Sequence, residues 1–111
     1  MYYIAPDAPP IDVKAVTSSA RAISASWQPP PMIRQNGIIV NYNITYYSSK
    51  WEHRGIIQVG SNIRSAVIKG LIPFTSYSIT VSAATAIGFG PSSAAVLSST
   101  LQAGKFIRSS S

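Results

Sequence analysis

The stretch LIPFTSYSITVSA, residues 71–83, decides the fold class of this 111-residue chain. From residue 76 it alternates small polar with apolar side chains, the pattern of a β-strand with one face in a core and the other in water. Because Pro73 lies just before the alternation, we expect the chain to enter this strand through a corner. The residues predicted to point inward are Tyr77, Ile79, Val81 and Ala83.

Short runs of the same kind recur along the chain, and no segment keeps the apolar spacing of an amphipathic helix. Residues 21–27 place Ile23, Ala25 and Trp27 on one face. In the run 39–47, Ile39 is out of phase with the inward set that begins at Tyr42, so we expect a bulge or an irregular start there. The sequence therefore predicts an all-β fold with seven strands, at residues 11–16, 21–27, 39–47, 55–59, 64–68, 76–83 and 94–100.

The length fits one domain with a single core between two layers. We expect residues 8–101 to form this domain, residues 1–7 to be an N-terminal lead-in, and residues 102–111 to be a C-terminal tail or linker. No run of about 18 apolar residues is present, so we expect no membrane insertion. The first residues lack the features of a signal peptide, so we expect any such leader to lie outside this sequence.

Nine Lys and Arg residues against three Asp and Glu give a formal net charge of +6. A basic balance attracts polyanions such as sulfated glycosaminoglycans or nucleic acid. The basic residues are scattered singly, however, without the cluster that marks a nucleic-acid site. Polyanion binding through a sulfated glycosaminoglycan is therefore a hypothesis that rests on net charge, and we expect no specific nucleic-acid site.

Cysteine is absent, which excludes disulfides and thiolate-based zinc sites. The triplet Asn43-Ile44-Thr45 matches the acceptor for an N-linked glycan. Because Asn43 follows the inward Tyr42, we expect its side chain to face solvent. The sequence therefore makes Asn43 the glycosylation candidate.

The chain offers little material for catalysis, since it has one His, three acidic residues and no nucleophile-elbow motif. Glu52 and His53 are adjacent, so on an extended chain their side chains point apart. His53 also lacks partners for metal binding. We therefore predict no catalytic, cofactor or metal site.

Three groups of residues together resemble a fibronectin type III domain over roughly residues 8–101: Trp27 with the prolines after it, the set Leu71, Pro73 and Tyr77, and the loop Gly88-Phe89-Gly90-Pro91-Ser92. The sequence looks most like the modules of receptor tyrosine phosphatase and neuronal adhesion-molecule ectodomains. The resemblance implies an Ig-like antiparallel β-sandwich without a disulfide, in which Trp27 and Tyr42 fill the core. It also implies a tyrosine corner, with the Tyr77 hydroxyl bonded to backbone near Leu71.

The function that the resemblance implies is a non-catalytic, monomeric module that serves as a spacer and protein-interaction unit in an extracellular or cell-surface protein. Its partner would be another protein or a neighbouring domain. The alternatives are a glycosaminoglycan-binding module, an intracellular muscle-type scaffold module, and an accessory domain of a secreted carbohydrate enzyme.

Two surfaces are candidates for partner binding. The loops 29–37 and 84–93 should emerge at the same pole of the sandwich, where their apolar residues would form a patch or cover the end of the core. Trp51 is a second candidate, with Arg54 close enough in sequence to stack on it. The apolar loop residues are Met32, Ile33, Ile87 and Phe89.

Overall fold

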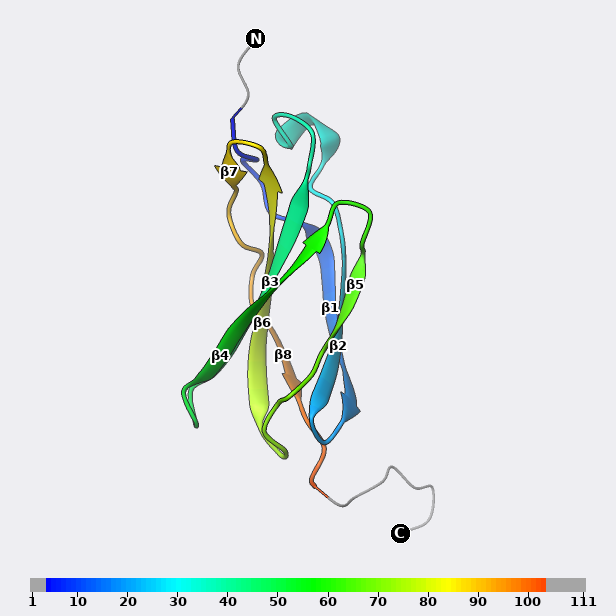
Figure 1. Ribbon diagram of the computed structural model, residues 1–111, viewed down its shortest axis with the longest axis vertical. Helices are drawn as coiled ribbons and strands as arrows, with labels where there is room; N and C mark the ends of the chain where they lie inside the picture. Colours follow the sequence, from blue (N-terminus) through cyan, green and yellow to red (C-terminus); the bar gives the residue numbers. More distant parts are fainter. Residues whose placement is uncertain (1–3, 104–111) are drawn as a thin grey trace.

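The computed structural model describes residues 4–103, so the first three residues and positions 104–111 of the expected tail lie outside the described residues. Two antiparallel sheets face each other and enclose the core (Figure 1). The elements in chain order are β1 (Ile11–Ser19), β2 (Ala22–Gln28), the 3-10 helix η1 (Met32–Arg34), β3 (Asn41–Ser48), β4 (His53–Gly60), β5 (Ser65–Ile68), β6 (Ser76–Thr85), β7 (Gly88–Phe89) and β8 (Val96–Ser99).

The smaller sheet has the order β1-β2-β5, and the larger has the order β4-β3-β6-β7 with β8 also paired to β6. β3 and β6 are the central strands of the larger sheet, where Ile44 pairs with Val81 and Tyr42 with Ala83. This arrangement confirms the predicted all-β sandwich, which the sequence alternation indicated.

The core consists of the inward residues of both sheets. Ile23, Ala25 and Trp27 of β2 are each at most 1% exposed, as their alternation predicts. Trp27 packs against Tyr42 across the sandwich, with ring centroids 5.6 Å apart. Their partners in the core cluster include Ile39, Ile44, Ile68, Leu71, Tyr77, Ile79, Val81 and Ala83.

The largest difference from the sequence prediction lies after β6. That strand continues to Thr85 because Gly88 and Phe89 fold back as β7 and pair with Thr85 and Ala84. The segment predicted to be only a loop therefore contains an eighth strand. β8 is correspondingly shorter than predicted and begins at Val96.

The start of β3 is irregular, as the phase of Ile39 predicted. Ile39 reaches the core from the segment in front of β3, and the amide of Val40 donates to the carbonyl of Ala84 at 2.8 Å. β4 in turn begins at His53, two residues earlier than predicted, because every residue of β3 has a partner in β4.

The loops of the sandwich lie at two poles. The N-terminal pole consists of residues 4–10, residues 29–40 with η1, and the turn between β6 and β7. The C-terminal pole consists of the β1–β2 turn, the β3–β4 turn at residues 49–52, the corner at residues 69–75 and residues 100–103. The described chain enters at the first pole and leaves at the second (Figure 1).

Candidate functional site

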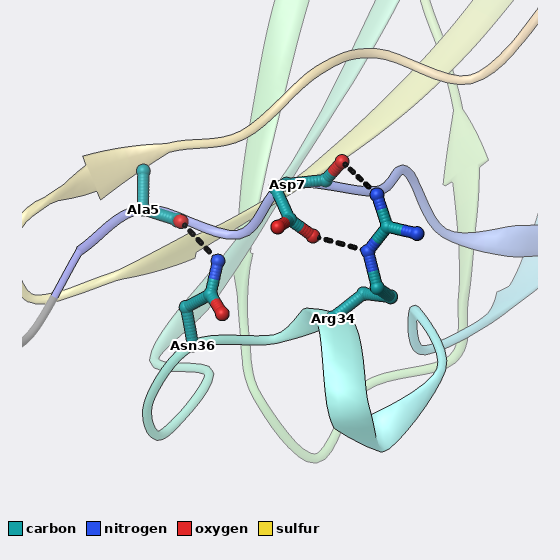
Figure 2. Close-up of polar contacts among 4 residues, drawn as sticks. All are labelled: Ala5, Asp7, Arg34 and Asn36. Atoms are coloured by element: carbon teal, nitrogen blue, oxygen red, sulfur yellow. Dashed lines mark hydrogen bonds and ion pairs between the residues drawn. The ribbon is translucent and has the colours of Figure 1, made fainter.

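The lead-in is held at the N-terminal pole by hydrogen bonds to the loop around η1 (Figure 2). The Nε of Arg34 donates to the Asp7 carboxylate at 2.6 Å, and the Asp7 amide donates to the Arg34 carbonyl at 3.0 Å. Asn36, with a φ of 59°, turns its side-chain amide onto the carbonyl of Ala5 at 3.1 Å. The segment that was predicted to be a lead-in therefore packs on the domain from residue 4 onward.

The other side of the lead-in contacts the turn between β6 and β7. The Thr85 hydroxyl donates to the carbonyl of Ile4 at 3.0 Å. Pro6 is buried, and a Cβ placed on Gly90 would overlap its carbonyl oxygen. The lead-in thus lies between the two loops and fixes the backbone of both.

The Asp7 carboxylate has a lowered pKa. The hydrogen bond from Arg34 is the main cause, and it holds the pKa below the usual value of 3.8. Both side chains are 53% exposed. The pair therefore orients the lead-in more than it stabilises the fold, because exposed ion pairs contribute little to the free energy of unfolding.

The apolar loop residues occupy this pole on both sides of the lead-in. Met32 and Ile33 are each 86% exposed, Ile87 is 62% exposed and Phe89 is 41% exposed. The expected single patch is therefore divided, since residues 4–7 run between the two loops. Met32 and Ile33 are also too exposed to cover the core.

Two further apolar residues at this pole were missed from the sequence. Ile38 is 79% exposed and Val40 is 39% exposed, and with Thr85 and Ala86 they line a hollow of about 270 Å³. The signal was present in three consecutive apolar residues at positions 38–40, because an extended chain that buries Ile39 turns Ile38 and Val40 to the other face. Ile38 and Val40 therefore add exposed apolar surface beside the turn between β6 and β7.

Trp51 lies at the opposite pole and is 53% exposed. Its ring N–H donates to the Thr75 hydroxyl at 3.1 Å, and the Lys50 amine lies 5.3 Å from its ring centroid. The expected stacking of Arg54 on Trp51 is wrong, because Arg54 stacks on Tyr47 at 4.7 Å. Arg54 and Tyr47 are cross-strand partners, which places the two side chains together.

Two of the basic residues within positions 4–103, Arg54 and Arg64, lie near opposite ends of β4. Arg54 lies near the β3–β4 turn, whereas Arg64 follows the far end of β4 and stacks over Tyr42, 5.5 Å from the ring centroid. Burial raises the pKa of Tyr42 above its usual value near 10.0. Arg54 and Arg64 thus cover tyrosine rings.

Asn43 lies on the outer face of β3, between Gln58 of β4 and Ser82 of β6. Its side chain points outward, but it is half-buried, and its Oδ1 has no hydrogen-bond partner among residues 4–103. The expectation of a solvent-facing side chain is therefore only partly correct. The neighbouring strands crowd a residue at the centre of a sheet.

The Tyr77 hydroxyl accepts a hydrogen bond from the Ile72 amide at 3.0 Å, which is the geometry of a tyrosine corner. His53 was missed as a second partner, with its Nδ1 2.8 Å from the same hydroxyl oxygen. Pairing of His53 with Ser48 in the longer β4 brings the imidazole there. Within residues 4–103, no three His, Cys, Asp or Glu residues come together as a metal site.

No helix in the described part of the chain is long and apolar enough to cross a membrane.

Comparison with known proteins identifies the family. The profile of the family described as "Fibronectin type III domain" matches residues 7–99. Receptor-type tyrosine-protein phosphatase F of Danio rerio is 37% identical over 95 residues, which are 83% of this chain and 5% of that protein. The cell adhesion molecule DSCAM of Gallus gallus is 37% identical over 103 residues, which are 88% of this chain and 5% of that protein.

Among solved structures, the FN1–FN3 domains of chicken CNTN1 superpose with a TM-score of 0.78 at 30% identity, covering 88% of this chain and 33% of that one. The chain thus spans about one twentieth of the curated relatives it matches. Those relatives are receptor-type and cell-adhesion proteins, which confirms the predicted extracellular, cell-surface location. In them the matched domain is a non-catalytic module, and this chain belongs to the fibronectin type III family.

Proposed function

We propose that the domain is a monomeric spacer and protein-interaction module, and that its N-terminal pole is the surface that meets a partner. The observation that carries the proposal is the exposure of four apolar side chains, Met32, Ile33, Ile38 and Ile87, at 62–86% on one pole. Apolar surface gathered in this way is typical of an interaction site.

The preceding domain of the parent protein is the partner that best fits this pole. Ile4 is bonded to Thr85 beside the hollow, so a domain attached ahead of it is delivered to the same surface. The hydrogen bonds of Asp7 and Asn36 fix the direction in which residues 4–7 enter the domain. A spacer needs such a fixed direction, since a flexible connection would leave the angle between domains undefined.

A fragment that includes this preceding domain tests the proposal. Residual dipolar couplings should report one orientation of the two domains in the wild type. In the double variant Ile33→Ser with Ile87→Ser the fixed orientation should be lost, while the free energy of unfolding of this domain changes by less than about 1 kcal/mol.

The matched control is Ile56→Ser with Leu97→Ser, two residues that are 63% and 71% exposed on the outer face of the larger sheet. This variant should keep the wild-type orientation. Domains that already reorient freely in the wild type, or an orientation that survives the pole variant, would exclude the N-terminal pole as the contact surface.

The proposal also includes one N-linked glycan at Asn43. The acceptor triplet and the outward direction of this side chain support it. Secretion from a eukaryotic host should add one glycan that Asn43→Gln removes, as intact mass would show. An unmodified secreted product would exclude Asn43 as a glycosylation site.

A further inference from the structure

Four basic residues that stand apart in the sequence gather at the C-terminal pole. They come from three places in the chain: the β1–β2 turn, the β3–β4 turn with the start of β4, and the corner before β6. All four are exposed to solvent. They are Arg21, Lys50, Arg54 and Lys69.

Hydrogen bonds join these loops into one surface. The Leu71 amide donates to the Arg21 carbonyl at 3.0 Å, which ties the corner to the β1–β2 turn. The ring N–H of Trp51 donates to the Thr75 hydroxyl at 3.1 Å, which ties the β3–β4 turn to the same corner. The domain therefore presents the cations of the three loops at one end.

Acidic residues do not balance these cations. Of the three acidic residues in the chain, Glu52 lies at this pole, whereas Asp7 belongs to the lead-in and Asp12 to the start of β1 at the other end. The one ion pair among residues 4–103 joins Arg34 to Asp7 at the N-terminal pole. The C-terminal pole thus has an excess of positive charge, which attracts polyanions.

Two exposed aromatic rings lie among the cations. Trp51 is 53% exposed and Phe74 is 72% exposed. The Thr75 hydroxyl holds the Trp51 ring, and the Phe74 amide donates to the Leu101 carbonyl at 2.9 Å. The Lys50 amine lies 5.3 Å from the Trp51 ring centroid, so this pole presents a cation and an apolar ring together.

We propose that the C-terminal pole binds a sulfated glycosaminoglycan chain. Because the cations come from three loops around one end of the domain, a flexible, extended polyanion can reach them together more readily than the side of a folded protein. The C–H faces of its sugar rings would pack on Trp51 and Phe74, while its sulfates pair with the cations. The extracellular location brings the domain into contact with such chains.

A heparin octasaccharide is the probe for this proposal, and a polyglutamate peptide of equal net charge is its control. Titration of the 15N-labelled domain with the octasaccharide, at an ionic strength of about 0.15 M, should give saturable shifts at this pole. The amides expected to move are those of residues 20–22, 49–54 and 69–75, together with the ring N–H of Trp51. Polyglutamate should bind several-fold more weakly, because it has no sugar rings.

Charge-removing variants locate the site. Lys50→Gln with Lys69→Gln should weaken octasaccharide binding by up to about 25-fold, because each exposed ion pair contributes up to about fivefold in affinity. Lys14→Gln with Arg34→Gln removes the same charge outside this pole. This control should change binding by less than about twofold, since salt screens distant exposed charges.

Ring-removing variants test the contact with the sugar. Trp51→Leu keeps every charge of the domain and should still weaken octasaccharide binding several-fold. Phe74→Asn repeats the test at the second ring, and asparagine tolerates the φ of 51° at this position. Both variants should bind polyglutamate as the wild type does, and the denaturation midpoint of each shows that it is folded.

Four results would overturn the proposal: no saturable shift at the C-terminal pole, equal affinity for the octasaccharide and polyglutamate, equal losses in the two charge variants, or wild-type octasaccharide binding in both ring variants. None of these results bears on the N-terminal pole, whose test uses the preceding domain. This inference therefore stands or falls apart from the proposed interaction surface.

Discussion

The two poles of this sandwich hold their loops by different means. At the N-terminal pole, backbone and side-chain hydrogen bonds to the lead-in position the loops, and the apolar side chains on those loops stay in solvent. At the C-terminal pole, the corner is tied into the core through Leu71 and Tyr77, and hydroxyl groups fill the remaining space. The N-terminal pole therefore exposes aliphatic side chains on loops that the lead-in holds, whereas the C-terminal pole exposes the rings of Trp51 and Phe74 beside a corner that is anchored in the core.

The same kind of side-chain truncation should therefore cost much more stability at the C-terminal pole than at the N-terminal pole. Leu71→Ala at the C-terminal pole removes a side chain that is 1% exposed and should cost about 2–5 kcal/mol of unfolding free energy. Ile33→Ala at the N-terminal pole should cost less than about 0.5 kcal/mol. Chemical denaturation of both variants measures the difference. Equal losses would show that the η1 loop packs into the core.

Removal of the Tyr77 hydroxyl should cause the next largest loss of unfolding free energy. Tyr77→Phe leaves the Ile72 amide and His53 without their shared partner and should cost about 1–3 kcal/mol while the sandwich is retained. Tyr47→Phe, a half-buried tyrosine on the outer face of β3, is the control and should have little effect. A denaturation midpoint for Tyr77→Phe within error of the wild type would show that the hydrogen bonds of the Tyr77 hydroxyl do not stabilise the fold.

Two glycines test how tightly the lead-in is packed. Gly90→Ala brings a methyl group against the Pro6 backbone and should cost about 1–3 kcal/mol or release residues 4–7 from the pole. Gly60→Ala meets open space and should be close to neutral. NMR chemical shifts of residues 4–10 distinguish release from strain. Identical spectra and stabilities for the two variants would contradict the close contact.

A smaller effect should appear with pH. The Asp7 pKa is lowered in the folded domain, so the Arg34 contact is complete above the usual value of 3.8 and is lost as pH falls through the lower folded pKa. The Nε–H resonance of Arg34 should report this loss below about pH 4, and Asp7→Asn should abolish the transition. An Arg34 signal that is unchanged down to pH 2 would exclude the ion pair.

Much of the fold was predictable because strand alternation reports directly on the core. Ile23, Ala25, Trp27, Tyr77 and Ile79 were placed correctly from period two alone. β7 was not predictable in the same way, because two residues carry no periodicity and the strand exists only through pairing with Thr85. The bond between His53 and Tyr77 likewise depends on cross-strand register, which the local sequence does not specify.

The candidate site was predicted in part. The sequence placed Met32, Ile33 and Ile87 on loops at one end of a sandwich and left open whether they form a patch or cover the core. The position of the lead-in between those loops depends on contacts from Asp7 to Arg34 and from Ile4 to Thr85, which are 27 and 81 residues apart in sequence.

The solvent exposure of the isoleucine methyl groups tests the central claim most directly. A soluble paramagnetic chelate should relax the δ1 methyls of Ile33, Ile38 and Ile87 strongly in this domain alone. In the fragment that includes the preceding domain these three methyls should become shielded, while Ile56 stays exposed and Ile44 stays buried in both. If Ile33, Ile38 and Ile87 relax equally in the two proteins, the N-terminal pole is not the surface that meets the preceding domain.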